Sequence, residues 1–382
     1  MTEGSPATVS KTVSAGRIEL GHSPELDGLR GVAIALVLIY HYVVAITPAS
    51  PDSPTWWLIR ALSPTWSGVD LFFVLSGYLI GGILEENRTA SNFLRVFYWR
   101  RACRILPAYA LNLVAAVLIP LLFVDFFRGT TLDAGSFPVW SYFLFVQNLV
   151  MAARDAWSSW PLTWSLAVEE QFYFFLPPLF LLARTRLVPI LLTLGLAAPV
   201  LRHFLPSQIA AYVLPISRAD SLFLGVLLAL LVRRNPTVAF RLGSSRILVP
   251  VLAACSVGIG LIQPWWRLEP MRSAGMFVLA LTYGALLIKS QVGREGVLGH
   301  TLRNTRLMWL GRRSYFIYLA HTTALIAVHW LIRGHSARND GALGFAVTLA
   351  AFGLTLLAAE ISWRLIEAPA IRAGHRQVFK HN

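Results

Sequence analysis

Cysteine is nearly absent from this chain of 382 residues, which contains only Cys103 and Cys255. Two cysteines cannot build the disulfide framework that stabilises small secreted domains. They also cannot supply most of the ligands of a zinc site made from thiolates. We therefore predict no metal site and look for chemistry in other side chains.

Charged residues are scarce as well, at 14% of the chain against 56% hydrophobic residues. Soluble globular domains contain about 25% charged residues, so this composition excludes an ordinary soluble protein. The net charge of +14 would suggest nucleic acid as the partner of a soluble protein. Here the charges lie between apolar segments, where membrane topology explains them. We expect the protein to lie in a lipid bilayer and to have no nucleic-acid partner.

Apolar segments dominate the rest of the sequence and approach the roughly 20 residues that a helix needs to cross a bilayer. They predict an all-α polytopic transmembrane helical bundle of about ten spans. The apolar piece 137–150 is too short for a crossing and contains Pro138, so we expect 137–163 to be interfacial or re-entrant. The predicted spans are 28–48, 68–84, 105–124, 164–183, 187–205, 211–232, 247–264, 271–289, 313–333 and 342–366.

The basic residues indicate how the bundle is oriented, because short cytoplasmic loops carry an excess of Lys and Arg. The basic clusters fall on one side of the membrane only if 137–183 contributes one net crossing. Ten spans in the cell membrane, with both termini cytoplasmic, satisfy this condition. The tryptophans of the opposite loops then fit an interfacial belt: Trp56, Trp57, Trp66, Trp157, Trp160, Trp265 and Trp266.

The chain has no internal repeat and is predicted to consist of one membrane domain between two tails. Residues 1–24 are polar and lack the apolar core of a secretory signal, which predicts a disordered cytoplasmic tail. The membrane domain is expected at 25–370, and 371–382 form a short basic cytoplasmic tail. We expect no attached extracytoplasmic catalytic domain, so the bundle itself carries the function.

Arg30 and His41 bracket the first apolar helix. Their separation corresponds to about 16 Å and almost three whole turns, which places both side chains on one face. An ionisable group in the membrane is costly and usually faces a bundle interior or a watery cavity. His41 is therefore a candidate functional residue, and the alternative is a histidine hydrogen-bonded between helices.

Asp70 lies just inside the outer boundary of the second span, where a carboxylate needs a partner. It enters the membrane close to the depth at which His41 leaves it. Asp70 could orient the His41 imidazole and raise its basicity, or it could be solvated at the interface. In the same span, Gly77 and Gly81 form a small-x-x-x-small pair typical of close helix packing.

Three arginines, Arg100, Arg101 and Arg104, begin the third span. They could anchor the helix to anionic lipid on the cytoplasmic side. Alternatively they form a phosphate clamp, for which the planar guanidinium is suited. Taken alone, these residues favour the anchor.

Two adjacent acids, Glu169 and Glu170, stand at the entrance to the next apolar helix. Neighbours 100° apart cannot share a face, so one can reach a cavity while the other meets the interface or a basic partner. A carboxylate there could act as general base, bind a hydroxyl or coordinate an ion.

Near the end of the chain, Ser314, Tyr318 and His321 fall on one helical stripe. His321 is expected near the middle of the membrane. A structural hydrogen bond is the favoured role, and the alternative is a polar core shared with His41.

Together these segments resemble acyltransferase family 3, integral-membrane proteins that include bacterial O-acyltransferases of surface polysaccharides, lipooligosaccharides and macrolide sugars. The pieces occur in the order found in the family and span nearly the whole chain. They are Leu26-Asp27-Gly28-Leu29-Arg30-Gly31 followed by His41, Gly68-Val69-Asp70-Leu71-Phe72-Phe73-Val74-Leu75-Ser76-Gly77-Tyr78, Arg101 to Arg104 with Ile105-Leu106-Pro107, Trp164-Ser165-Leu166 leading to Glu169-Glu170-Gln171-Phe172-Tyr173, Ser314-Tyr315 to His321, and Glu367-Ala368-Pro369.

The resemblance implies ten spans, an acyl-CoA donor on the cytoplasmic side, and essential roles for Arg30 and His41. It places Arg101 and Arg104 at the anionic part of the donor. We also expect Asp27, beside Arg30, to have a supporting role. Ala320 is a small departure, because many members carry a bulkier residue before the histidine.

We therefore expect transfer of a short acyl group, with acetyl-CoA as first candidate donor, to a sugar hydroxyl of a glycan, glycolipid or glycoside. His41 would act as general base, with Arg30 on a donor phosphate or carbonyl and Glu169 in the catalytic set. No oxyanion donor is identified, no bound cofactor is expected, and an acyl-histidine intermediate stays open. The alternatives are a transporter with a buried His, Arg and Glu path and a non-catalytic scaffold.

Overall fold

The computed structural model describes residues 23–122, 137–158, 160–292 and 296–381. Every regular element in these residues is helical, and none of them forms a strand. This confirms the all-α architecture. The predicted N-terminal tail, 1–24, lies almost entirely outside the described residues.

Four helices form the centre of the bundle: α1 (Pro24–Ile39), α3 (Gly68–Asn87), α11 (Ala219–Arg234) and α16 (Thr305–Arg333). The helix α3 packs along α11, and α1 packs along α16. Glycine makes the first approach possible, because a methyl group at Gly77 would stand 2.0 Å from the carbonyl oxygen of Leu222. The packing role predicted for Gly77 is therefore confirmed.

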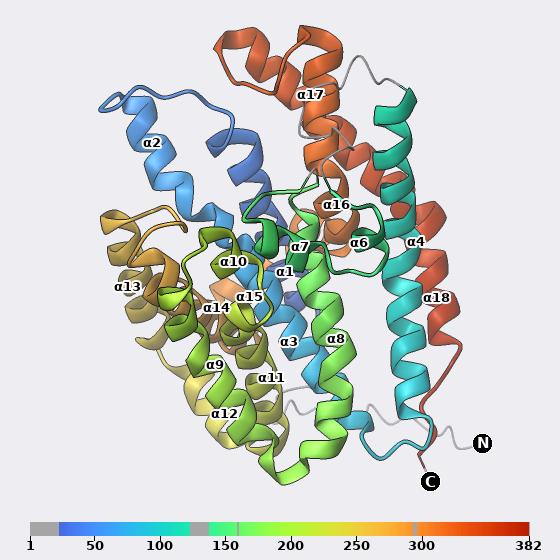
Figure 1. The fold of residues 1–382 in the computed structure, drawn as a ribbon. Helices are drawn as coiled ribbons and strands as arrows, with labels where there is room; N and C mark the ends of the chain where they lie inside the picture. Colours follow the sequence, from blue (N-terminus) through green and yellow to red (C-terminus); the bar gives the residue numbers. More distant parts are fainter. Residues whose placement is uncertain (1–22, 123–136, 159, 293–295, 382) are drawn as a thin grey trace, which may run out of the picture.

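The remaining long helices surround this centre. In Figure 1, α4 and α18 lie side by side at one edge of the bundle, and α12, α13 and α14 occupy the opposite edge. The bounds are α4 (Phe93–Leu122), α8 (Thr163–Ala183), α9 (Leu187–Phe204), α12 (Pro236–Ser244), α13 (Leu248–Ile262), α14 (Met276–Val292), α17 (Gly341–Ser362) and α18 (Ala368–His375). The short helices are α2 (Pro54–Leu62), α6 (Trp140–Phe143), α7 (Gln147–Arg154), α10 (Gln208–Val213) and α15 (Val297–Leu302).

Within the described residues, seven helices are long and apolar enough to cross a membrane, or eight if α12 and α13, bent by 62°, count as one span. This confirms a polytopic helical membrane protein. Two of the ten predicted segments, 105–124 and 211–232, fall in α4 and in α10 with α11. Neither α4 nor α11 is among the helices counted, so the total of ten stays a prediction.

The segment after α4 contains only the short helices α6 and α7 where it is described. Four and eight residues are too few to cross a bilayer, which agrees with the prediction that 137–163 is not a full span. Polar side chains attach this segment to the bundle. Gln147 donates to the carbonyl of Thr163 at 2.8 Å, and Asn148 donates to the carbonyl of Val213 at 3.2 Å.

The predicted tryptophan belt is wrong for Trp66, Trp160 and Trp266. Their exposed fractions are 2%, 7% and 6%, so they pack inside the protein rather than against the lipid interface. Trp66 and Trp266 both contact the ring of Tyr212, at centroid distances of 6.3 and 3.9 Å. Trp57, which is 56% exposed, remains suited to an interfacial position.

The C-terminal segment also packs against the protein. The helix α18 runs through the predicted boundary at residue 370, and the residues after it lie on the connection between α3 and α4. The Ser91 amide donates to the Lys380 carbonyl at 3.0 Å, and the Lys380 amide donates to Asn92 Oδ1 at 2.9 Å. This segment therefore borders the same end of the bundle as the start of α4.

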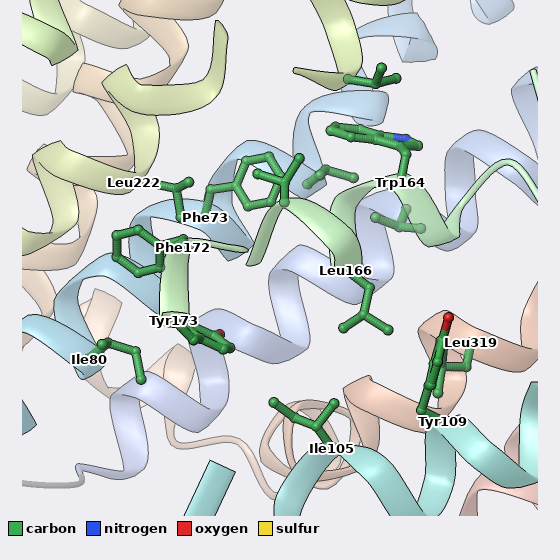
Figure 2. Packing of buried hydrophobic residues seen from close by; sticks show 14 of the residues in the cluster. Phe73, Ile80, Ile105, Tyr109, Trp164, Leu166, Phe172, Tyr173, Leu222 and Leu319 are labelled. Atoms are coloured by element: carbon green, nitrogen blue, oxygen red, sulfur yellow. The ribbon is translucent and has the colours of Figure 1, made fainter. Parts of the chain in front are cut away.

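The apolar core lies where α3, α4, α8, α11 and α16 meet (Figure 2). Its side chains come from segments far apart in the sequence, which fixes these helices around a common interior. The residues labelled in Figure 2 are Phe73, Ile80, Ile105, Tyr109, Trp164, Leu166, Phe172, Tyr173, Leu222 and Leu319.

Candidate active site

A cavity of about 390 Å³ lies among α1, α3, α4, α8 and α16. Its size falls in the range of small-molecule sites. The helix α3 contributes a lining stripe that begins at Val69, recurs every three or four residues and ends at Glu86. At 1.5 Å per residue this stripe is about 26 Å long, so the cavity follows most of the helix.

Three arginines line this cavity: Arg30 from α1, and Arg101 and Arg104 from α4. Within the described residues none of them forms a hydrogen bond or an ion pair with a carboxylate, and the Nε of Arg101 is buried without a partner. Buried cations are costly unless an anion compensates them. The cavity is therefore suited to a ligand that carries several negative charges.

Two further arginines line the cavity but already have partners. Arg100 donates twice to the carbonyl of Gln377, at 2.7 and 3.1 Å, and its guanidinium lies over the Phe379 ring. Arg233 forms an ion pair with Glu86 at 2.6 Å. Of the three arginines predicted to bind the donor, Arg101 and Arg104 are available to an anion, whereas Arg100 holds the C-terminal segment.

Glu169 lines the middle of the cavity, where α8 meets α3. The Ser76 hydroxyl donates to Glu169 Oε1 at 2.8 Å, and the Tyr173 hydroxyl donates to Oε2 at 3.1 Å. Both carboxylate oxygens are thus fixed in position. Glu170 does not line the cavity, as the 100° separation predicts, and its Oε1 is buried without a partner in the described part of the chain.

Only part of the predicted stripe of Ser314, Tyr318 and His321 on α16 lines the cavity. Ser314 and Tyr318 line the cavity, while His321 is fully buried beyond it. The Nδ1 of His321 lies 3.0 Å from the carbonyl oxygen of Ile317 and 2.9 Å from that of Tyr318. Among the described residues, the Ser314 hydroxyl and the Nε2 of His321 are buried without a partner.

His41 lies in a π-helical turn, Tyr40–Val44, directly after α1. Such turns are frequent at functional sites. Its Nδ1 is 2.9 Å from the carbonyl oxygen of Val37. A carbonyl can only accept, so Nδ1 carries the proton and Nε2 keeps a lone pair that can act as a base.

His41 does not line the cavity, although Arg30 on the same helix does. Ring contacts connect them indirectly: Tyr318 in the cavity wall is 5.8 Å from His321, and His321 is 5.0 Å from His41. The Nδ1 contacts of His321 with backbone carbonyls agree with the favoured role of a structural hydrogen bond, and its ring contact with His41 is compatible with the alternative of a shared polar core. Arg30 and His41, predicted to share one helix face, therefore do not line the same cavity.

The predicted pairing of Asp70 with His41 is also wrong. Asp70 forms an ion pair with Arg218 at 3.1 Å, and both side chains are 1% exposed, which excludes solvation at the interface. Ser221 donates to the same carboxylate oxygen at 3.3 Å. The Val37 carbonyl, rather than a carboxylate, fixes the tautomer of His41.

Asp27 has a structural position at the other end of α1. It forms an ion pair with Arg312 on α16 at 2.9 Å, and its side chain is buried. Arg312 is followed on α16 by Arg313 and Ser314, so this pair holds the helix that supplies Ser314 and Tyr318. The supporting role expected for Asp27 therefore has a geometric basis.

Three cavity residues had been given no role from the sequence, although they lie in the family segments: Ser76, Ser165 and Tyr173. Tyr173 follows Glu169 by four residues, and this helical spacing was a signal that could have found it. Ser76 belongs to α3, so its bond to Glu169 depends on how two distant segments pack.

Comparison with known proteins identifies the family of this chain. The family model of an acyltransferase domain matches residues 23–363. The relatives include proteins named O-acetyltransferase OatA from Staphylococcus aureus strains NCTC 8325 / PS 47 and COL. Each is 29% identical over 389 residues, covering 94% of this chain and 60% of the relative.

The chain thus spans about 60% of the length of these curated relatives. No solved structure matches it. The family model nevertheless covers nearly all the described residues, including every helix that lines the cavity except α18, which contributes His375. The chain belongs to acyltransferase family 3.

Proposed function

We propose that this protein transfers a short acyl group from acyl-coenzyme A to a sugar hydroxyl of a glycan, glycolipid or glycoside. The observation that carries the proposal is the set of Arg30, Arg101 and Arg104 around one cavity, without a bound carboxylate in the described residues. Coenzyme A bears a diphosphate and a further phosphate on a long, narrow arm. Arginine is suited to phosphate oxygens, and the relatives named O-acetyltransferases favour acetyl as the group moved.

The donor lies along α3 in this proposal. Its phosphates meet Arg101 and Arg104, and its arm follows the apolar stripe towards Val69. The carbonyl of the thioester then approaches Arg30, whose N–H groups stabilise the negative charge that develops on the carbonyl oxygen. The cytoplasmic side of the cell membrane is the expected source of the donor.

Acyl transfer requires a base that accepts the proton of the acceptor hydroxyl. The hydroxyl oxygen attacks the thioester carbon, a C–O bond forms, the C–S bond breaks, and coenzyme A leaves as a thiolate that takes up a proton. His41 is the proposed base, because its Nε2 lone pair is free. In this conformation His321 and Tyr318 lie between His41 and the cavity, so the proposed transfer requires these side chains to let the acceptor hydroxyl reach the thioester carbon.

Glu169 is the second titratable group available to this chemistry, and it lines the cavity directly. Its carboxylate oxygens are already occupied by Ser76 and Tyr173. We therefore assign it to orienting the site rather than to accepting the proton. Glu169→Gln should lower transfer less than His41→Ala does.

Donor binding tests the proposal without knowledge of the acceptor. Purified protein in nanodiscs is titrated with coenzyme A by calorimetry at fixed ionic strength. Loss of a hydrogen bond to a charged group costs roughly 1.5–3 kcal/mol, so Arg101→Ala or Arg104→Ala should weaken binding at least about tenfold. Arg241→Ala removes an exposed arginine outside the cavity and is the matched control.

Transfer itself is measured with radiolabelled acetyl-CoA and a pool of host glycans and glycosides, in proteoliposomes. We expect the wild-type protein to transfer label to a carbohydrate, and His41→Ala to transfer at least about 100-fold less. Label retained on the wild-type protein but absent from His41→Ala would indicate an acyl-histidine intermediate. Accumulation of a solute without consumption of acyl-CoA would contradict the proposal in favour of a transporter.

A further inference from the structure

Tyr318 borders the cavity on the side of His321. It lines the main cavity of about 390 Å³ on one side and a second hollow of about 10 Å³ on the other. The second hollow is the size of a single water molecule and is bordered by Trp160, Leu319 and Thr322, among others. Of the residues that the structure describes, Tyr318 is the one that lines both of these spaces.

The Tyr318 side chain is held from two other helices. Its hydroxyl lies 2.7 Å from the Ser165 hydroxyl and donates to the Leu162 carbonyl at 3.2 Å. Its ring meets the edge of Phe72 on α3 at a centroid distance of 6.2 Å. Two polar contacts and a packed ring hold Tyr318 in the cavity wall.

The cavity changes character along its length. The arginines without a carboxylate partner at the start of α4, Arg101 and Arg104, line one part of it, whereas the Tyr318 ring packs against the apolar ring of Phe72. Val69 and Leu166 are further apolar lining residues. A donor with phosphates at one end and an acyl group at the other is oriented by this difference. Its acyl end points towards Tyr318.

We propose that Tyr318 sets the length of the acyl group by stopping its terminal carbon. This rests on the proposed acyl-CoA function and adds the selectivity of the same site. An acetyl group ends before the ring of Tyr318. A longer chain would have to enter the space that the ring occupies.

Removing the ring should therefore extend the range of donors. Tyr318→Val joins the vacated space to the second hollow, and each methylene that gains an apolar position is worth about fourfold. Butyryl-CoA has two more methylenes than acetyl-CoA. The ratio of kcat/KM for butyryl-CoA to that for acetyl-CoA should rise by roughly 15-fold.

Two variants control this measurement. Tyr318→Phe keeps the ring and loses only the hydroxyl, so the ratio should stay within about threefold of wild type. Tyr283→Val removes a ring from α14, outside the cavity, and should leave the ratio unchanged. If Tyr318→Val does not fold, Tyr318→Leu removes the ring with a smaller loss of volume and should shift the ratio in the same direction.

The outcomes separate this inference from the proposed function. A wild-type protein that transfers acetyl while Tyr318→Val or Tyr318→Leu keeps the wild-type ratio overturns the role of Tyr318 alone. A wild-type protein that neither binds coenzyme A nor consumes acetyl-CoA overturns the proposed function first. A ratio that rises equally in Tyr318→Phe shows that the hydroxyl, and not the length of the cavity, decides the preference.

Discussion

The buried ion pair between Asp70 and Arg218 gives the most demanding test of the structure. In Asp70→Asn the guanidinium of Arg218 loses its carboxylate while remaining 1% exposed. Removing one partner of a buried pair costs about 3–5 kcal/mol. Arg218 keeps the Tyr212 carbonyl at 2.8 Å and lies over the rings of Tyr212 and Trp164. We therefore expect a loss near the lower limit, about 3 kcal/mol.

The assay is equilibrium unfolding of the purified protein in one mild detergent. Glu85→Gln is the control, because its ion pair with Arg234, at 2.8 Å, lies partly exposed and should contribute at most about 1 kcal/mol. The double variant Asp70→Asn with Arg218→Met removes both charges and should recover much of the loss. An Asp70→Asn variant as stable as Glu85→Gln, or a double variant no more stable than Asp70→Asn, would refute the reasoning.

Two further predictions concern the base and the helix packing. His41→Ala should lower transfer by about 10²- to 10⁴-fold yet leave coenzyme A affinity within about twofold, because His41 is outside the cavity. Label transfer measures the first effect and calorimetry measures the second. An equal loss of binding would place His41 in the donor site. Gly77→Ala should cost about 1–3 kcal/mol of unfolding free energy, since its methyl would meet the Leu222 carbonyl at 2.0 Å. Gly258→Ala, with nothing within 4 Å, is the matched control and should not destabilise; a harmless Gly77→Ala would contradict the close packing.

Helical periodicity by itself determined which residues share a face. It separated Glu169 from Glu170, it grouped Ser314 with Tyr318, and it identified Gly77 as a packing position. These predictions hold because the 3.6-residue repeat is a property of the local backbone and survives in any bundle. The lengths of the apolar segments likewise indicated a polytopic membrane protein, although they left the number of spans open.

Partners across the bundle were decided only by the tertiary structure. Asp70 meets Arg218, which is 148 residues away, instead of His41. Trp66 enters the core instead of the lipid interface, and Arg100 binds the carbonyl of Gln377 instead of an anion. A helical pattern states which way a side chain points but not which helix stands opposite. The sequence therefore identified the arginines, the histidines and the glutamate, while the packing of α3, α8 and α16 decided which of them face one cavity.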